Sequence, residues 1–127
     1  MAKRKSIEID GFKHSNPIPA ASLLGNLLMS GLLSGKDPAT GDMPESLDEQ
    51  MDNAFGHVRA VVEAAGGTTD DIVKINVWLK DPARRSEVNR PWVEMFPDED
   101  ARPARHTHQL HAGGDALIHV DVTAVIG

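Results

Sequence analysis

The residues best suited to chemistry lie near the end of the chain, in residues 102–109 (RPARHTHQ) and just after them. This segment holds two arginines and two histidines, and four of the six histidines of the chain fall between positions 106 and 119. A guanidinium group binds a carboxylate through two parallel hydrogen bonds. A neutral imidazole is a general base whose ordinary pKa, about 6.5, suits neutral pH. If the protein carries out chemistry, we expect it at this segment.

Strand alternation divides this segment between two faces. If it is extended, Arg105 and Thr107 are expected on one face, and His106 and His108 on the other. The spacing of His106, His108 and His111 is compatible with a zinc site. A histidine-rich rim that binds anions, or that faces solvent, explains the same spacing. Because no carboxylate completes a metal site, we predict no metal.

Composition narrows the class of protein. The 127 residues match the usual size of one domain, and we expect a single domain with residues 1–6 as a flexible tail. The formal net charge of −6 argues against nucleic acid as a partner, because a row of phosphates needs a basic surface. There are no cysteines, and no apolar run approaches the roughly 20 residues of a membrane helix. We therefore predict a cytoplasmic protein without a membrane partner.

Two helices are predicted from apolar periodicity. Residues 44–65 repeat apolar side chains at spacings of three and four, with Ser46 and Glu49 placed as a capping box and Gly66 at the end. A second helix is expected over 83–96, with a kink or break at Pro91. Its inward residues are expected to be Val88, Trp92, Met95 and Phe96. The remaining histidines, His14 and His57, are expected at the surface.

Strands are predicted at 6–10, in one or two pieces between 23 and 33, and at 72–79, 105–111 and 117–126. In 72–79, one face of alternating residues is expected in the core: Val73, Ile75, Val77 and Leu79. Residues 113–115 form a predicted turn, so the last two strands are expected to pair as a hairpin. This order predicts an α/β (α+β) sandwich, with two helices on one face of a mixed six-stranded sheet.

Short motifs along the chain resemble one protein family in their order and spacing. They are NPIPA at 16–20, GN at 25–26, SG at 30–31, DPATG at 37–41, VVEAAG at 61–66, DIVK at 71–74, VN at 88–89 and PAR at 103–105. Over about residues 14–126 the chain resembles the RidA/YjgF family of enamine and imine deaminases. The resemblance implies a chorismate-mutase-like fold and a homotrimer with ligand clefts between subunits. It also implies hydrolysis of small enamine or imine acids to 2-keto acids and ammonia, without a cofactor.

The resemblance also implies roles for individual residues. The family's signature arginine, which binds the substrate carboxylate, corresponds to Arg105. His119 stands where the family has a glutamate that positions the attacking water. Ile18 replaces an aromatic residue, often tyrosine, and His106 replaces a small residue, often serine. The expected substrate-binding residues, besides Arg105, are Ile18, Ser30, Gly31, Asn89 and Thr107.

These departures leave several functions open. The first is a deaminase in which Arg105 holds the carboxylate and His119 assists the water. The second is a non-catalytic binder of small carboxylates, or a regulatory partner of a metabolic enzyme. The third is a deaminase for a larger catabolic enamine. Arg105 could instead be a solvated or ion-paired surface residue, and His119 a half-exposed residue at a subunit interface.

Overall fold

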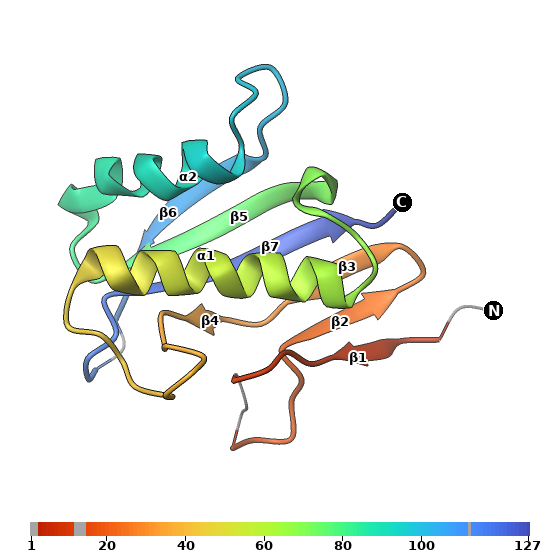
Figure 1. Ribbon diagram of the computed structural model, residues 1–127, viewed down its shortest axis with the longest axis horizontal. Helices are drawn as coiled ribbons and strands as arrows, with labels where there is room; N and C mark the ends of the chain where they lie inside the picture. Colours follow the sequence, from red (N-terminus) through yellow and green to blue (C-terminus); the bar gives the residue numbers. More distant parts are fainter. Residues whose placement is uncertain (1–2, 12–14, 112) are drawn as a thin grey trace.

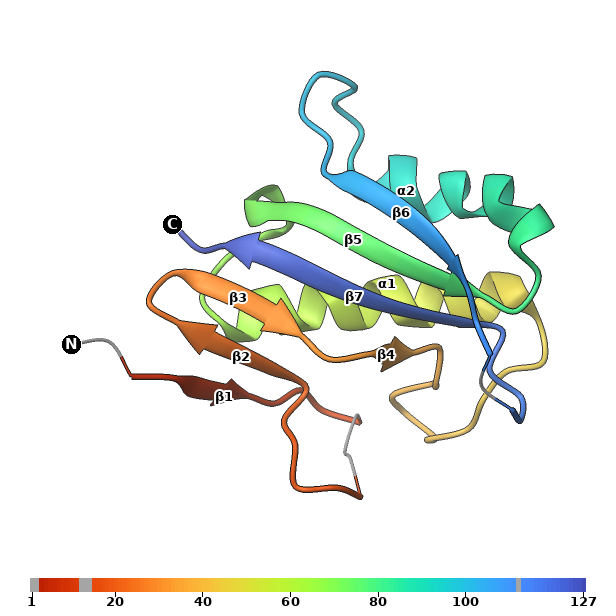
Figure 2. The same cartoon turned by 180° about the vertical axis from the view of Figure 1, so that it is seen from behind.

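The chain folds into one layer of strands covered on one face by helices. The computed structural model describes residues 3–11, 15–111 and 113–127; the predicted surface residue His14 lies outside them. Within these ranges a seven-stranded sheet carries two α-helices on one face (Figures 1 and 2). Its strands are β1 (Lys5–Ile7), β2 (Ala21–Leu24), β3 (Leu27–Ser30), β4 (Leu33–Ser34), β5 (Ile72–Leu79), β6 (Ala104–Gln109) and β7 (Ile118–Val125). The helices are α1 (Leu47–Ala64) and α2 (Asn89–Met95), and 3₁₀ turns η1 (Thr69–Asp71) and η2 (Pro82–Val88) precede β5 and α2.

The α+β sandwich expected from the sequence is confirmed, with small differences in its strands. The sheet has one strand more than the six predicted, because the two-residue β4 pairs with β7 separately from β3. Strand β1 begins at Lys5, where it pairs with Leu23 of β2. The end of the predicted flexible tail, residues 5 and 6, therefore belongs to the sheet.

The predicted hairpin between the last two strands is wrong. The strand order is β1-β2-β3-β7-β5-β6, so β5 lies between β6 and β7. β5 pairs in parallel with β6 and antiparallel with β7. A parallel pair needs a crossover connection, and the segment containing η2 and α2 provides it. In place of the predicted turn the chain bends at residues 114–115, with Gly114 at a φ of 83°. Residues 110–117 make a longer connection between β6 and β7 than a common hairpin loop of two to five residues.

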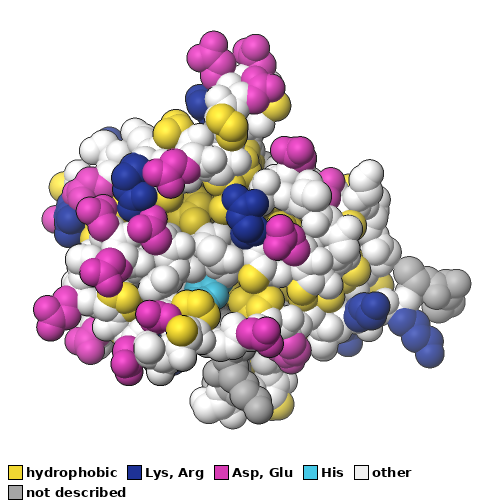
Figure 3. Space-filling model, viewed as in Figure 1, with side chains coloured by type: hydrophobic (Ala, Val, Ile, Leu, Met, Phe, Trp, Pro, Cys, Tyr) yellow, Lys and Arg dark blue, Asp and Glu magenta, His cyan; other side chains and the backbone are white. Residues whose placement is uncertain are grey.

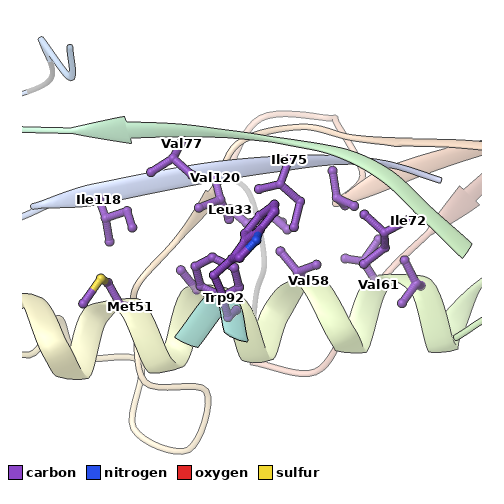
Figure 4. Close-up of a cluster of buried hydrophobic side chains, with 14 of the residues drawn as sticks. Leu33, Met51, Val58, Val61, Ile72, Ile75, Val77, Trp92, Ile118 and Val120 are labelled. Carbon is purple, nitrogen blue, oxygen red and sulfur yellow. The ribbon is translucent and has the colours of Figure 1, made fainter. Parts of the chain in front are cut away.

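Helix α1 supplies one side of the core, as its periodicity predicts. The Ser46 hydroxyl accepts a hydrogen bond from the Glu49 N–H at 3.1 Å, and Gly66 ends the helix at a φ of 92°. In Figure 4, Met51, Val58 and Val61 of α1 point toward a layer of sheet residues: Leu33, Ile72, Ile75, Val77, Ile118 and Val120. The helix therefore buries its apolar stripe against β4, β5 and β7.

His57 is a correction to the predicted surface histidines. It lies on α1 but is only 3% exposed. Its Nε2 atom lies 2.9 Å from the Lys36 carbonyl oxygen. The loop after β4 covers this side of the helix, and Asn53 donates a second hydrogen bond to it, at 3.0 Å from the Gly35 carbonyl oxygen. A helical position that periodicity alone leaves in solvent is thus covered by a distant loop.

Strand β5 departs from the predicted alternation at one residue. Ile72 pairs with Ala124 while Lys74 pairs with Thr123, so the register shifts at Val73 as in a β-bulge. The bulge turns Val73 outward, where its side chain is 50% exposed. Ile72 is buried in the core in place of Val73, which was the residue predicted there. The predicted inward residues Ile75, Val77 and Leu79 are buried as expected.

The predicted second helix is divided, but not at its proline. The 3₁₀ turn η2 ends at Val88 and α2 starts at Asn89, so Pro91 falls in the first turn of α2. Proline is tolerated there because the first N–H groups of a helix have no intrahelical partner. Val88, Trp92 and Phe96 are buried as predicted.

Replacing the buried Gln50 with leucine is expected to destabilise the fold by about 2–4 kcal/mol. Its Nε2 donates to the carbonyl oxygens of Pro44 at 2.7 Å and Asp115 at 3.0 Å, and its Oε1 accepts from the Leu117 N–H at 2.8 Å. Leucine would leave these three backbone groups without partners. Urea unfolding measures the change, and the exposed Glu63→Leu on the same helix is the control, expected to differ from wild type by less than about 0.5 kcal/mol. Equal effects of the two substitutions would contradict this role of Gln50.

Candidate active site

Arg105 lies on the helix-bearing face of the edge strand β6. It pairs with Ile75, whose side chain is in the core, so both point toward the helices. Its Nη2 donates to Asn89 Oδ1 at 2.8 Å, and its guanidinium carbon lies 4.9 Å from the ring centroid of Trp92. Its Nη1 atom is buried and has no hydrogen-bond partner among the described residues. An unused buried donor costs about 1–3 kcal/mol, which favours a ligand-binding role.

The charge of Arg105 is also unpaired within the described residues. No carboxylate of that part of the chain forms an ion pair with it, whereas the exposed Arg84 and Arg90 both have acidic partners. Burial lowers the pKa of Arg105, but a guanidinium stays charged at neutral pH. The site therefore holds a positive charge without an ion-pair partner and a buried N–H donor without an acceptor among the described residues.

His119 lies on the opposite face of the sheet, in a hollow. On β7 it pairs with Ser34 of β4 and with Trp78 of β5, whose side chains face away from the helices. The hollow has a volume of about 1150 Å³, and its walls include Ile18, Leu32, Ser34, Lys36 and Met43. Within the described residues, His119 Nδ1 is buried without a hydrogen-bond partner. Burial lowers the pKa of His119, which favours the neutral imidazole that can accept a proton.

A single chain does not bring Arg105 and His119 together. Trp78 pairs with both His119 and His108, so these two histidines share a face of the sheet. Arg105 occupies the other face, next to α2. In Figure 3, which views the helix-bearing face, the arginines, lysines and acids are prominent and histidine contributes little surface. The two predicted catalytic residues thus lie at separate places on the sheet, which are named the Arg105 half-site and the His119 half-site.

The predicted substrate-binding residues divide between these two half-sites. Asn89 contacts Arg105 directly, and Thr107 follows Arg105 on the same face of β6. Ile18 is 53% exposed and lines the hollow beside His119. Asn89 and Thr107 therefore lie on the same side of the sheet as Arg105, and Ile18 lines the same hollow as His119.

Ser30 and Gly31 have local backbone partners at the end of β3. The Ser30 hydroxyl accepts from the Val122 N–H at 2.9 Å and lies 2.8 Å from the Gly31 carbonyl oxygen, to which it donates. The Gly31 N–H donates to the Ala20 carbonyl oxygen at 2.9 Å. The bond from Val122 connects β7 to the end of β3, and the bond from Gly31 connects the chain after β3 to the residue before β2. These bonds hold the end of β3, from which the chain continues to β4 and to Ser34 in the wall of the hollow.

The other histidines of β6 belong to a polar cluster on the helix-free face. His106 and His108 lie together as alternation predicts, with ring centroids 4.1 Å apart, and His108 stacks on Trp78 at 4.8 Å. His108 Nε2 lies 3.1 Å from Asn76 Oδ1, and Asn76 Nδ2 donates to Asp121 Oδ1 at 3.0 Å. In the described parts of the chain, no three side chains of the metal-binding kinds gather in one place.

Trp92 is the residue of the site that sequence analysis assigned only to the core. It is buried, yet its ring also lies under the Arg105 guanidinium. The available signal is its position three residues after Asn89, because residues three apart share a helix face. That signal identifies a neighbour of Asn89, but not that Arg105 of a distant strand lies over it.

Comparisons with known proteins identify the family. Residues 18–126 match the family described as endoribonuclease L-PSP. The chain is 34% identical over 88 residues to a RutC family protein of Aquifex aeolicus, covering 69% of this chain and 70% of that protein. It is 32% identical over 104 residues to the 2-iminobutanoate/2-iminopropanoate deaminase of Escherichia coli, covering 80% and 81%.

The fold agrees with this match. The crystal structure of the YjgF gene product of Escherichia coli superposes with a TM-score of 0.84 at 28% identity, covering 95% of this chain and 98% of that one. Among the described residues, neither helix has the length and apolar character needed to cross a bilayer. The sequence match and the shared sheet architecture lead to the same conclusion: the chain belongs to the endoribonuclease L-PSP family, which includes the RidA/YjgF proteins.

Proposed function

We propose that the protein hydrolyses small 2-imino acids, and the enamines that tautomerise to them, to 2-keto acids and ammonia. The observation that carries the proposal is the pair of buried nitrogens without partners, Arg105 Nη1 and His119 Nδ1. The Arg105 nitrogen can donate a hydrogen bond to a carboxylate, and the His119 nitrogen belongs to a ring that can accept a proton. The Escherichia coli relative named for this activity supports the choice of reaction.

The site is completed by two copies of the chain. Because Arg105 and His119 project from opposite faces of the sheet, one ligand can touch both only if they come from different copies. The helix-free face also carries exposed apolar side chains, Leu27, Met29 and Val125, which favour burial against another chain. A closed ring of three copies, as the family resemblance implies, would repeat the same head-to-tail contact three times.

The chemistry needs only positioning and one base. Arg105 holds the substrate carboxylate through its unused N–H edge. Neutral His119 of the neighbouring copy accepts a proton from water as the water oxygen attacks the imine carbon. His119 passes this proton to the imine nitrogen, which gives a neutral carbinolamine. His119 then removes the proton of the carbinolamine hydroxyl and delivers it to the amino nitrogen as the C–N bond breaks, so the carbonyl group forms and ammonia leaves. A positioned general base of this kind contributes about 10²–10⁴-fold.

A mixture of two inactive variants tests the shared site. Arg105→Ala and His119→Ala should each lose turnover of 2-iminobutanoate, measured as ammonia and 2-ketobutanoate formed. Co-assembled from equal amounts, they should regain about one quarter of the wild-type activity per chain, since about one interface in four joins an intact Arg105 to an intact His119.

The control is a blend of the two variants assembled separately, which should stay inactive. Co-assembled trimers without activity would exclude a site shared between copies. Wild-type protein that binds 2-ketobutanoate but turns over no imine would favour the non-catalytic carboxylate binder, a function that the replacement of the family glutamate by His119 leaves open.

A further inference from the structure

Trp92 forms a rigid floor under the guanidinium of Arg105. The indole is 7% exposed, and its ring centroid lies 4.9 Å from the guanidinium carbon. Phe96 packs against it at 4.9 Å with an interplanar angle of 63°, and Phe55 of α1 packs edge-on at 6.5 Å and 89°. Two aromatic neighbours on different elements therefore fix the plane of the indole.

Arg105 is held by two contacts of different kinds. The side-chain Oδ1 of Asn89 accepts a hydrogen bond from Nη2 at 2.8 Å, which restricts rotation of the guanidinium within its plane. The guanidinium carbon lies over the Trp92 ring, and the ring limits movement of the guanidinium toward it. Asn89 and Trp92 are three residues apart on α2 and so share one helix face. With both contacts in place, Nη1 is left without a partner among the described residues.

We propose that Trp92 is a positioning residue for carboxylate recognition, holding the Arg105 guanidinium so that its unused edge faces the ligand. The inference rests on the proposed function only in taking a carboxylate as the ligand. Trp92 itself touches neither the reacting atoms nor the carboxylate.

An aromatic floor suits this task better than an acidic partner. A carboxylate beside Arg105 would use its N–H groups and neutralise its charge, and would therefore compete with the substrate. A ring face attracts the cation without accepting any N–H group in its plane. It also offsets part of the cost of burying the charge, the same burial that lowers the pKa of Arg105. The guanidinium thus stays charged and unpaired until a ligand arrives.

Binding measurements on Trp92→Leu and Trp92→Phe test this role. Calorimetry with 2-ketobutanoate should show a Kd raised roughly tenfold in Trp92→Leu and about threefold or less in Trp92→Phe, which retains a ring face. In steady-state kinetics the weaker binding by Trp92→Leu should appear as a raised KM, with kcat changed by less than about twofold. The uncharged 2-ketobutanamide should bind all three proteins with similar affinity, because it lacks the charge that a well-held guanidinium recognises.

The packing control is Val62→Ala, which shortens a fully buried side chain of α1 and leaves Trp92 and both its aromatic neighbours in place. It should lower thermal stability and leave the Kd for 2-ketobutanoate within about twofold of wild type. A folded Trp92→Leu protein that binds 2-ketobutanoate like wild type would overturn the proposal. So would an equal loss of binding in Val62→Ala.

A ligand-free measurement separates this inference from the proposed function. In wild-type protein, the ring current of Trp92 should displace the side-chain NMR signals of Arg105, and the displacement should vanish in Trp92→Leu. If these signals behave as expected while imines are not hydrolysed, the positioning role stands and the deaminase proposal fails. If the signals of Arg105 are the same in both proteins, the positioning role fails whatever the catalytic result.

Discussion

Arg105→Lys is expected to lower kcat/KM for 2-iminobutanoate about 100-fold or more, although it keeps the positive charge. Lysine has no planar fork, so it replaces two directed hydrogen bonds to the carboxylate by a point charge. It also loses the Asn89 hydrogen bond and the broad contact with the Trp92 ring. Arg105→Ala, which removes the charge as well, is expected to lose more. Steady-state kinetics on imine generated in the assay would measure both effects.

The control for this series is Arg84→Lys. Arg84 is an exposed residue of η2 that pairs with Glu87 and lies outside both half-sites. Its replacement should leave kcat/KM unchanged. Similar activity in wild type and Arg105→Lys would show that the guanidinium geometry is not used, and that Arg105 acts only through its charge or not at all.

His119→Gln is expected to lower kcat about 10²–10³-fold with a smaller change in KM. Glutamine can still form hydrogen bonds but cannot accept a proton from water. His119→Glu, which restores the residue type that the family resemblance places here, should retain much more activity than His119→Gln. The exposed His111→Gln, beyond the end of β6, should behave as wild type.

The pH profile provides a second measurement on the same residue. Burial lowers the pKa of His119, so its neutral, basic form persists below the ordinary value of about 6.5. The acid limb of kcat/KM in wild type should therefore lie below pH 6.5. In His119→Glu the limb should follow the carboxyl group instead. If the acid limb of kcat/KM lies at the same pH in wild type, His119→Gln and His119→Glu, His119 is not the base.

Several features followed from local sequence alone. The α1 boundaries were predictable because Ser46 and Gly66 mark its ends chemically, and its apolar stripe marks the buried face. The separation of Arg105 from His106 and His108 was predictable because alternation within one strand needs no tertiary information. The family motifs predicted the fold, which the comparisons confirm, and they also predicted a ligand-binding role for Arg105.

Other features depended on residues far apart in the chain. Val73 turned outward because of a register shift against β7, and His57 became buried because the loop after β4 covers it. Trp92 lies next to Arg105 because β6 pairs with β5 and forms the edge of the sheet. The crossover from β5 to β6 contains α2 and so places this helix over that edge. Periodicity contains none of these contacts, since each joins residues of different elements that are more than ten positions apart in the chain.

The relation between Arg105 and His119 separates what local sequence determines from what tertiary structure determines. The sequence by itself determined the fold class, the chemical types at both positions and the face that each residue occupies relative to its own strand. Only the tertiary structure decided that the two residues point in opposite directions. Alternation sets the faces of residues within one strand, whereas the phase between β6 and β7 is set by their separate pairings with β5.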